Sequence, residues 1–143
     1  LPHLNFTIAG DGPLKKSIAA QADELPNLDF LGWVARDDLL AAMDCADMLV
    51  LPSQLESFGT VALEAMARER LALVSLHCGI VEWADLAPQL YCIEAGQTLT
   101  VAIRAVAALS DDERHAQAQA ARAAAVAHCE ASLDEWLTRL QRE

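Results

Sequence analysis

A continuous apolar run, Met48-Leu49-Val50-Leu51, ends at a proline, and an almost wholly apolar segment over residues 60–67 follows after a short polar loop. The run predicts a strand that is buried on both faces, as in a parallel sheet. The second segment, TVALEAMA, predicts a buried helix, because apolar residues lie nearly all round it. Glu64 is the only charge in this segment. We expect a protein group or a ligand to hydrogen-bond its carboxylate, since an unpaired buried charge is costly.

The loop between the two segments has the features of an anion site. Gly59 allows the backbone to come close to another group. The N–H groups at the start of the helix, from about Phe58 to Val61, are free to bind an anion. A strand, a loop, a glycine and a helix N-terminus in this order are typical of phosphate binding at the carboxyl edge of an α/β sheet. A purely structural alternative is a tight turn, with Glu64 paired to Arg68 one helical turn later.

Strands and helices alternate along the rest of the chain. This alternation predicts an α/β fold with a doubly wound, Rossmann-like parallel sheet, three layers thick, and extra helices at the C-terminal end. The 143 residues are enough for one domain with its own core. Strands are predicted over 4–9, 28–33, 48–51, 71–76 and 90–94, and helices over 14–25, 34–43, 60–67, 97–109, 110–128 and from 132 onward, with a short helix in the turn after 77.

Composition and charge exclude several classes of protein. The net charge of -11 argues against nucleic acid and anionic membrane surfaces as main partners. A hydrophobic content of 54% excludes disorder, and the apolar runs are too short for a transmembrane segment. The four cysteines form no Cys-x-x-Cys pair and have no histidine at zinc spacing. We expect reduced thiols in the core of a cytoplasmic protein without a signal peptide.

Residues 56–64 carry a more specific pattern, Glu-Ser-Phe-Gly-Thr-Val-Ala-Leu-Glu, which Ala-Met-Ala follows. This Glu-x7-Glu motif resembles the donor site of retaining GT-B fold glycosyltransferases of the group 1 (family 4) type. That family includes glycogen synthases and many mannosyl- and glucosyltransferases. The strand and Gly-x-Gly-Pro turn at 4–13 and the Phe-Leu-Gly-Trp-Val segment at 30–34 extend the resemblance.

The resemblance also covers residues 78–82, where the family has Gly-Gly-Ile-Pro-Glu. Here the first glycine is Cys78 and the proline is Val81. Glu69 and Leu71 likewise stand where the family usually has a glycine and a proline before a strand.

For the whole chain, the resemblance implies the C-terminal, donor-binding domain of such an enzyme over residues 1–143. The domain's first strand and the N-terminal acceptor domain, its implied partner, would be absent. The full enzyme would be a hexosyltransferase that moves a sugar from a nucleotide sugar to an acceptor hydroxyl, and the fragment alone is expected to be inactive. No cofactor or metal is expected, because the donor site that the resemblance implies does not require a metal, and the sequence has no Asp-x-Asp pair that could hold one.

The resemblance assigns roles to individual residues. Glu56 would be the catalytic-site acid that contacts the transferred sugar, or lies near its anomeric carbon. Glu64 would accept hydrogen bonds from the ribose. The other donor-binding residues would be Ser57, Phe58, Gly59 and Thr60 around the diphosphate, Gly79 beside the sugar and phosphates, and Val34 and Arg36 beside the base.

Other functions stay open at this stage. The chain could be a degenerate relative that binds a nucleotide or a partner without catalysis, or a nucleotide-sugar epimerase-like domain that shares only the architecture. The two glutamates could also form a glycosidase pair, but no aromatic residues cluster around them to stack on a sugar. His77, next to the motif, could be catalytic, although packing or capping is the commoner role. For Trp33 we expect packing, and for His3, His115 and His128 surface roles.

Overall fold

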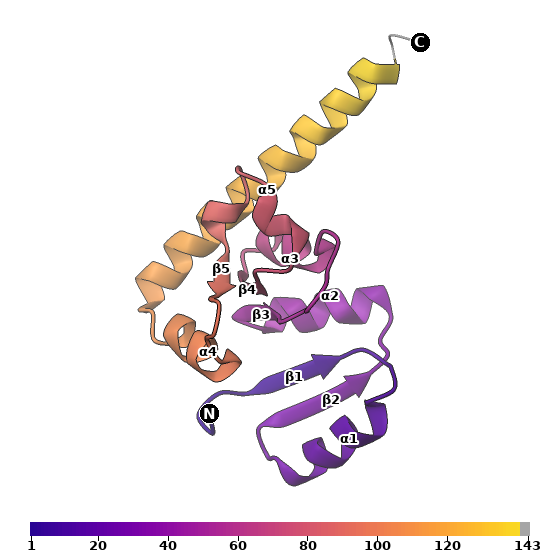
Figure 1. The fold of residues 1–143 in the computed structure, drawn as a ribbon, viewed down its shortest axis with the longest axis vertical. Coiled ribbons are helices and arrows are strands. Elements are labelled where there is room, and N and C mark those ends of the chain that lie inside the picture. Colours follow the sequence, from indigo (N-terminus) through magenta and orange to yellow (C-terminus); the bar gives the residue numbers. More distant parts are fainter. Residues whose placement is uncertain (141–143) are drawn as a thin grey trace. The chain divides into compact units, whose positions relative to one another are not determined.

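The computed structural model describes residues 1–140, apart from the side chains of Trp136, Arg139 and Leu140. The chain divides into two compact units, Leu1–Ala42 and Met43–Glu143. Helix α2 (Arg36–Cys45) contains the boundary between them. Each unit is an assembly of parallel strands and helices (Figure 1).

The first unit contains two strands and one further helix. Strand β1 (Phe6–Ala9) pairs in parallel with β2 (Leu28–Gly32), and α1 (Lys15–Glu24) packs against β2. The turn before α1 is closed by Asp11, whose carboxylate accepts hydrogen bonds from the Gly12 N–H at 2.8 Å and from Lys15 Nζ at 2.6 Å. The predicted strand, turn and helix are therefore confirmed.

The second unit is built on three parallel strands in the order β3-β4-β5, with bounds Met48–Leu51, Leu71–Ser75 and Tyr91–Ile93. The central strand β4 is buried at all five positions. The α/β class and the parallel pairing match the prediction. The five strands, however, form a two-stranded and a three-stranded sheet, each with its own hydrogen bonds, rather than one continuous sheet.

Helices cover the three-stranded sheet. Helix α3 (Thr60–Ala67) packs against β3, β4 and α5 (Asp111–Leu140), while α4 (Leu99–Ala107) packs against β4 and β5. Two short 3₁₀ turns, η1 (Gly79–Glu82) and η2 (Ala87–Gln89), lie between β4 and β5. The two helices are in contact, and the buried residues Ala62 and Ala65 on α3 and Ala118, Ala121 and Ala125 on α5 have small side chains that suit close packing. The core residues are Ala62, Met66, Ala72, Val74, Cys78, Ile80, Leu86, Leu90, Ala121 and Ala125.

The C-terminal part has two helices where the sequence predicted three. Helix α5 is continuous over 30 residues and extends past the sheet (Figure 1). The prediction of a new helix at Ser132 was wrong, because no glycine or proline interrupts the chain there. A serine inside a helix costs only a few tenths of a kcal/mol, about 0.5, so the preceding helix runs through it.

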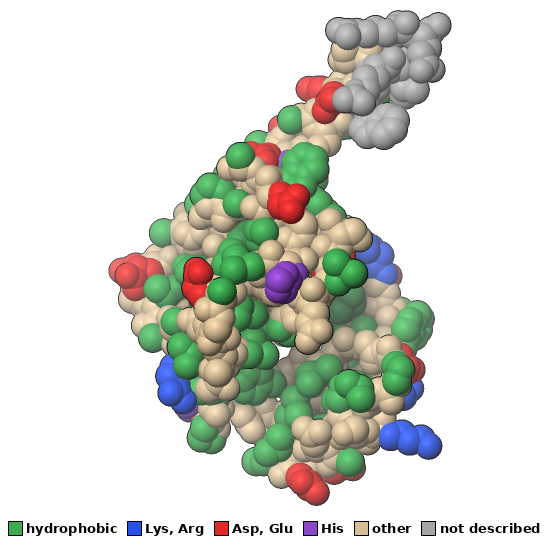
Figure 2. Space-filling model, in the orientation of Figure 1, with side chains coloured by type: hydrophobic (Ala, Val, Ile, Leu, Met, Phe, Trp, Pro, Cys, Tyr) green, Lys and Arg blue, Asp and Glu red, His purple; other side chains and the backbone are tan. Residues whose placement is uncertain are grey.

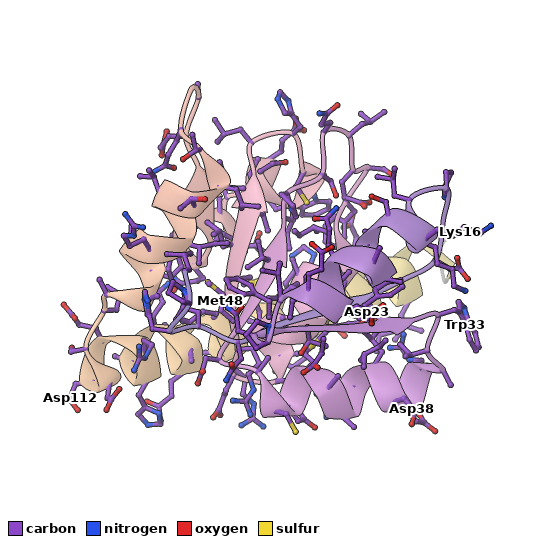
Figure 3. The ribbon with its side chains drawn as sticks, turned by 90° about the horizontal axis from the view of Figure 1, so that it is seen from below. Lys16, Asp23, Trp33, Asp38, Met48 and Asp112 are labelled. Atoms are coloured by element: carbon purple, nitrogen blue, oxygen red, sulfur yellow. The ribbon has the colours of Figure 1, made fainter. Side chains whose placement is uncertain are left out.

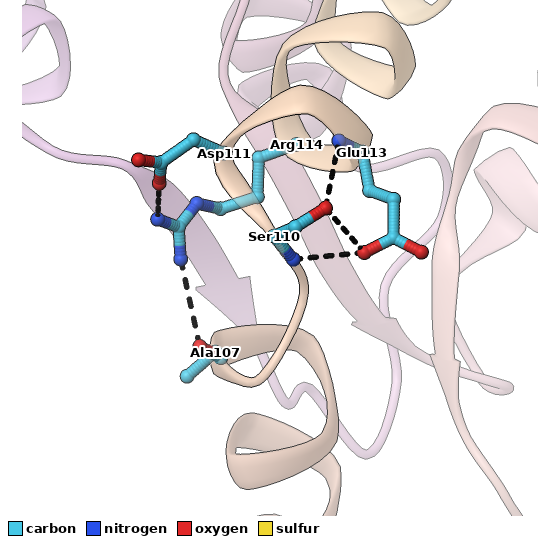
Figure 4. Close-up of polar contacts among 5 residues, drawn as sticks. All are labelled: Ala107, Ser110, Asp111, Glu113 and Arg114. Carbon is cyan, nitrogen blue, oxygen red and sulfur yellow. Dashed lines mark hydrogen bonds and ion pairs between the residues drawn. The ribbon is translucent and has the colours of Figure 1, made fainter.

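The start of α5 is a capping box. The Ser110 hydroxyl accepts a hydrogen bond from the Glu113 N–H at 3.3 Å, and Glu113 Oε2 accepts one from the Ser110 N–H at 2.8 Å (Figure 4). The Ser110 hydroxyl also donates to the same carboxylate, and this bond is the main reason that the pKa of Glu113 is lowered. The predicted cap is confirmed.

Ser110 caps the start of α5, whereas Ser132 lies inside the same helix, and this difference gives a testable prediction. Ser110→Ala should lower the free energy of unfolding by about 1 kcal/mol, because it removes a helix cap. Ser132→Ala, the matched control, should leave it unchanged or raise it slightly, since alanine is the better residue inside a helix. Chemical denaturation of both variants measures the effect. Equal losses in the two variants would contradict a single continuous α5.

The end of α3 shows how a glutamate fits at position 69, where the family usually has a glycine. Glu69 has a φ of 57°, in the left-handed region that favours glycine, and the Arg70 N–H donates back to the Ala65 carbonyl at 2.9 Å. A side chain in this conformation costs about 1 kcal/mol. The Glu69 carboxylate makes an ion pair of 2.7 Å with Arg122 on α5. The turn therefore has the shape that a glycine would give, with a glutamate that links α3 to α5.

All four cysteines are free thiols. Cys78 is buried and Cys92 is half-buried, and burial raises the pKa of both thiols. Cys45 and Cys129 are exposed, so the prediction of core thiols was wrong for these two. Among the described residues, no helix is both long and apolar enough to cross a membrane.

Candidate functional site

The candidate site begins where β3 ends. The loop over residues 52–59 leads to α3, and Gly59 precedes the helix with a φ of 96°, in the left-handed region. No side chain of the described residues caps the start of α3. The Gly59 carbonyl accepts from the Ala62 N–H at 2.8 Å and thereby closes the first turn. The N–H groups before this turn are of the kind that binds an anion at a helix N-terminus.

The loop after β3 is hydrogen-bonded to the loop after β4. The Glu56 N–H donates to the His77 carbonyl at 3.3 Å, and the Gly79 N–H donates to the Glu56 carbonyl at 2.9 Å. The Ile80 N–H donates to the Phe58 carbonyl at 2.7 Å. The carboxyl ends of two neighbouring strands thus carry one joined surface, which is where open α/β sheets bind their ligands. We call this surface, residues 53–60 and 77–80, the two-loop site.

Two glycines allow this close approach. A Cβ atom on Gly79 would lie 2.0 Å from the Ser57 carbonyl oxygen, and one on Gly59 would lie 2.4 Å from Cys78 Sγ. Glu56 is also close, because its Cγ would be 3.7 Å from the same Gly59 Cβ. The motif glycine and the glycine at 79 are therefore required by packing between the two loops.

Cys78, which replaces a family glycine, fits into this packing. Its side chain is buried under Gly59, and its Sγ–H donates to the Phe58 carbonyl at 3.3 Å. Ser75, at the end of β4, donates its hydroxyl to the Ser53 carbonyl and so adds a further tie to the first loop. The cysteine supports the loop geometry instead of disrupting it.

The two motif glutamates lie on either side of the start of α3. Glu56, in the loop, is half-buried, and so is Glu64, which lies four residues after Thr60 and therefore on the same face of the helix. The prediction that the whole helix is buried was too strong, since only Ala62, Ala65 and Met66 are.

Arg68, the alternative partner of Glu64, forms a two-point ion pair with Asp44. Its Nε donates to Asp44 Oδ1 at 2.6 Å, and its Nη2 donates to Oδ2. This hydrogen bonding is the main cause of the raised pKa of Arg68, and the charge of Glu64 makes a smaller contribution. Asp44 is thus the main partner of the Arg68 guanidinium, and Glu64 contributes less to its environment.

The remaining predicted residues lie in two places. Ser57, Phe58, Thr60 and Gly79 belong to the two-loop site with the residues above, and Ser57 and Thr60 are exposed. Val34 and Arg36 lie in the first unit, before and at the start of α2, and stay predictions for the contact with a base. In the same unit, Trp33 is 72% exposed and points outward, so it is not a core residue (Figure 3). The His77 side chain is exposed at the end of β4.

Sequence reasoning missed one residue beside the site. His128 on α5 is buried, so the predicted surface role was wrong. The signal was weak, because alanines occupy every face of this helix. The buried residues Ala118, Ala121 and Ala125 precede His128 at spacings of three and four, which is the helical pattern of a packed face.

A hollow of about 220 Å³ is separate from the two-loop site. It lies at the opposite ends of β3 and β4, and its lining includes both acids and bases, among them Asp47, Arg70 and Arg114. Ligands of open α/β sheets bind at the carboxyl edge, so we do not assign this hollow to the site.

Within residues 1–140, no three metal-ligating side chains gather in one place. On the face seen in Figure 2, basic side chains appear only at separate places.

Residues 1–125 match the model of the family of glycosyl transferases group 1. The chain belongs to this family. The predicted resemblance to this family is therefore confirmed, and the match extends over most of the sequence.

Curated relatives include proteins with named activities. A GDP-mannose-dependent alpha-(1-6)-phosphatidylinositol dimannoside mannosyltransferase of Mycobacterium tuberculosis is 30% identical over 122 residues, which are 85% of this chain and 31% of that protein. A glycogen synthase of Mycobacterium tuberculosis is 42% identical over 69 residues, or 46% of this chain and 17% of that protein. The chain thus spans about a third or less of the length of these relatives.

Solved structures share the fold of this chain. WaaG, a glycosyltransferase involved in lipopolysaccharide biosynthesis, superposes with a TM-score of 0.68 at 25% identity, over 85% of this chain and 33% of that one. Anabaena HepE, solved in complex with UDP-glucose, superposes with a TM-score of 0.70 at 22% identity, over 97% and 42% of the two chains. The GT-B, Rossmann-like fold class is therefore confirmed for this glycosyltransferase domain.

Proposed function

We propose that this chain is the nucleotide-sugar-binding part of a retaining hexosyltransferase. The observation that carries the proposal is the joining of the loops after β3 and β4, which sets Glu56 beside the uncapped start of α3. Family membership supports it, as do relatives named for GDP-mannose and a fold neighbour solved with UDP-glucose.

The chemistry follows from the charge that develops when a sugar is transferred. The leaving nucleoside diphosphate gains negative charge as the glycosidic bond breaks, so fixed N–H donors lower the barrier. We assign this role to the amides of Phe58, Gly59 and Thr60. The acid at Glu64 would accept hydrogen bonds from the ribose, and Glu56 would contact the transferred sugar. Ser57 and Gly79 line the same surface.

We further propose that the complete protein supplies another strand and an acceptor-binding domain. Strand β3 supports this, since it lies at the edge of its sheet. Its four residues, Met48–Leu51, are all apolar, and such a run is typical of a strand with neighbours on both sides. The four free thiols favour a reducing compartment such as the cytoplasm.

Ligand-observed NMR of the protein with UDP, GDP and ADP tests the proposal. We expect one nucleotide to give a saturation-transfer signal, and Glu64→Ala to remove most of it. A folded protein that binds none of the three would contradict the nucleotide-sugar function. A protein that binds one of them but does not turn over its sugar nucleotide would instead be a non-catalytic relative.

A further inference from the structure

Three aromatic rings meet beside the two-loop site. The rings of Phe58 and Trp83 have centroids 5.8 Å apart and are nearly perpendicular, at 88°. The His128 ring lies 4.7 Å from Trp83 at 89° and 6.3 Å from Phe58, nearly parallel to it at 20°. Phe58 comes from the first loop, Trp83 follows η1, and His128 comes from α5. The cluster therefore joins three segments that are far apart in the sequence.

His128 is held firmly in this cluster. The residue is only 9% exposed, and its Nδ1 lies 2.7 Å from Asp85 Oδ2. The carboxylate of Asp85 accepts this hydrogen bond, which is the main reason that the pKa of Asp85 is lowered. His128 thus has one fixed ring orientation, set by a residue that follows Trp83 by two positions.

Phe58 connects the cluster to the backbone of the site. Its carbonyl accepts hydrogen bonds from the Ile80 N–H at 2.7 Å and from Cys78 Sγ at 3.3 Å. The backbone N–H of Trp83 in turn donates to the Ile80 carbonyl at 3.3 Å. A shift of the Phe58 ring would therefore move the backbone that carries the first amides of α3.

We propose that His128 is a positioning residue that fixes the Phe58–Thr60 turn for a nucleoside diphosphate. This inference rests on the proposed function, because it assigns His128 a role in that site. Imidazole suits the place because it offers a flat ring to Phe58 and an N–H donor to Asp85. A phenylalanine would keep only the ring, and an asparagine only the donor.

Two measurements on His128→Ala test the proposal. The first is the hydrogen exchange rate of the Ile80 amide, which reports the bond to Phe58 without any ligand. We expect it to rise at least tenfold, while exchange at Val74 in β4 stays unchanged. The second is the dissociation constant for UDP, GDP or ADP, whichever the unmodified protein binds, which we expect to rise about tenfold.

Variants separate positioning from general stability. His115→Ala, the same change at an exposed position of the same helix, is the matched control and should leave both values unchanged. His128→Phe and His128→Asn each keep one of the two contacts and should give intermediate effects; they also decide the matter if His128→Ala does not fold.

The outcomes distinguish the two proposals. Unchanged Ile80 exchange and unchanged affinity in folded His128 variants would overturn the positioning role. Faster exchange throughout β4 as well as at Ile80 would also overturn it, because His128 would then act only on stability. If the unmodified protein binds none of UDP, GDP and ADP, the proposed function fails, and Ile80 exchange still decides whether His128 holds the turn.

Discussion

Gly79→Ala should destabilise the protein by about 3 kcal/mol and abolish nucleotide binding. The new Cβ would lie 2.0 Å from the Ser57 carbonyl oxygen and 3.3 Å from Phe58 Cα, so backbone atoms on both loops would have to move. Forced overpacking of this kind typically costs about 1–3 kcal/mol, and rigid backbone neighbours place it at the upper end. Chemical denaturation and a nucleotide titration measure the two effects.

Gly12→Ala is the control for this change. A Cβ on Gly12 meets no atom within 4 Å, and its φ is not in the left-handed region, so we expect a change below about 0.5 kcal/mol. A Gly79→Ala protein with normal stability and normal nucleotide affinity would show that the two loops need not be joined.

Alanine at the two motif glutamates should give two different defects. Glu64→Ala should weaken a nucleoside diphosphate and its sugar nucleotide alike, by about ten- to a hundredfold, since a hydrogen bond to a charged group contributes about 1.5–3 kcal/mol. Glu56→Ala should leave the affinity for the diphosphate within about twofold and lower kcat by about a hundredfold or more. Calorimetry with each ligand and a turnover assay of the complete protein separate these results.

Glu130→Ala, at an exposed position of α5, is the control for a lost carboxylate and should change neither value. If Glu56→Ala and Glu64→Ala weaken the diphosphate and the sugar nucleotide by the same factors, the assignment of sugar and ribose to separate acids is wrong.

Much of the second unit could be predicted from local patterns. The strand at 48–51 and the helix at 60–67 have the bounds expected from the sequence. Pro52 follows the last residue of the strand, and Gly59 precedes the first residue of the helix. The Ser110 cap was also predictable, since both of its partners lie within four residues.

Contacts between distant segments were not predictable in this way. Nothing local indicates that Glu56 and Cys78 pair as a parallel bridge, since 22 residues separate them and a single bridge has no periodicity. The division of the strands into two sheets depends on pairing partners, which a strand pattern does not specify. The burial of His128 depends on how α5 lies on α3, and an alanine-rich helix has almost no amphipathic signal.

The most direct test of the donor-site assignment is a comparison of two ligands by amide NMR. The protein is titrated with the nucleoside diphosphate that it binds and then with the corresponding nucleoside, which lacks the phosphates. We predict large shifts of the Phe58, Gly59 and Thr60 amides with the diphosphate and small ones with the nucleoside. If the diphosphate binds and these amides do not shift, the phosphates are held elsewhere and the account of the two-loop site is wrong.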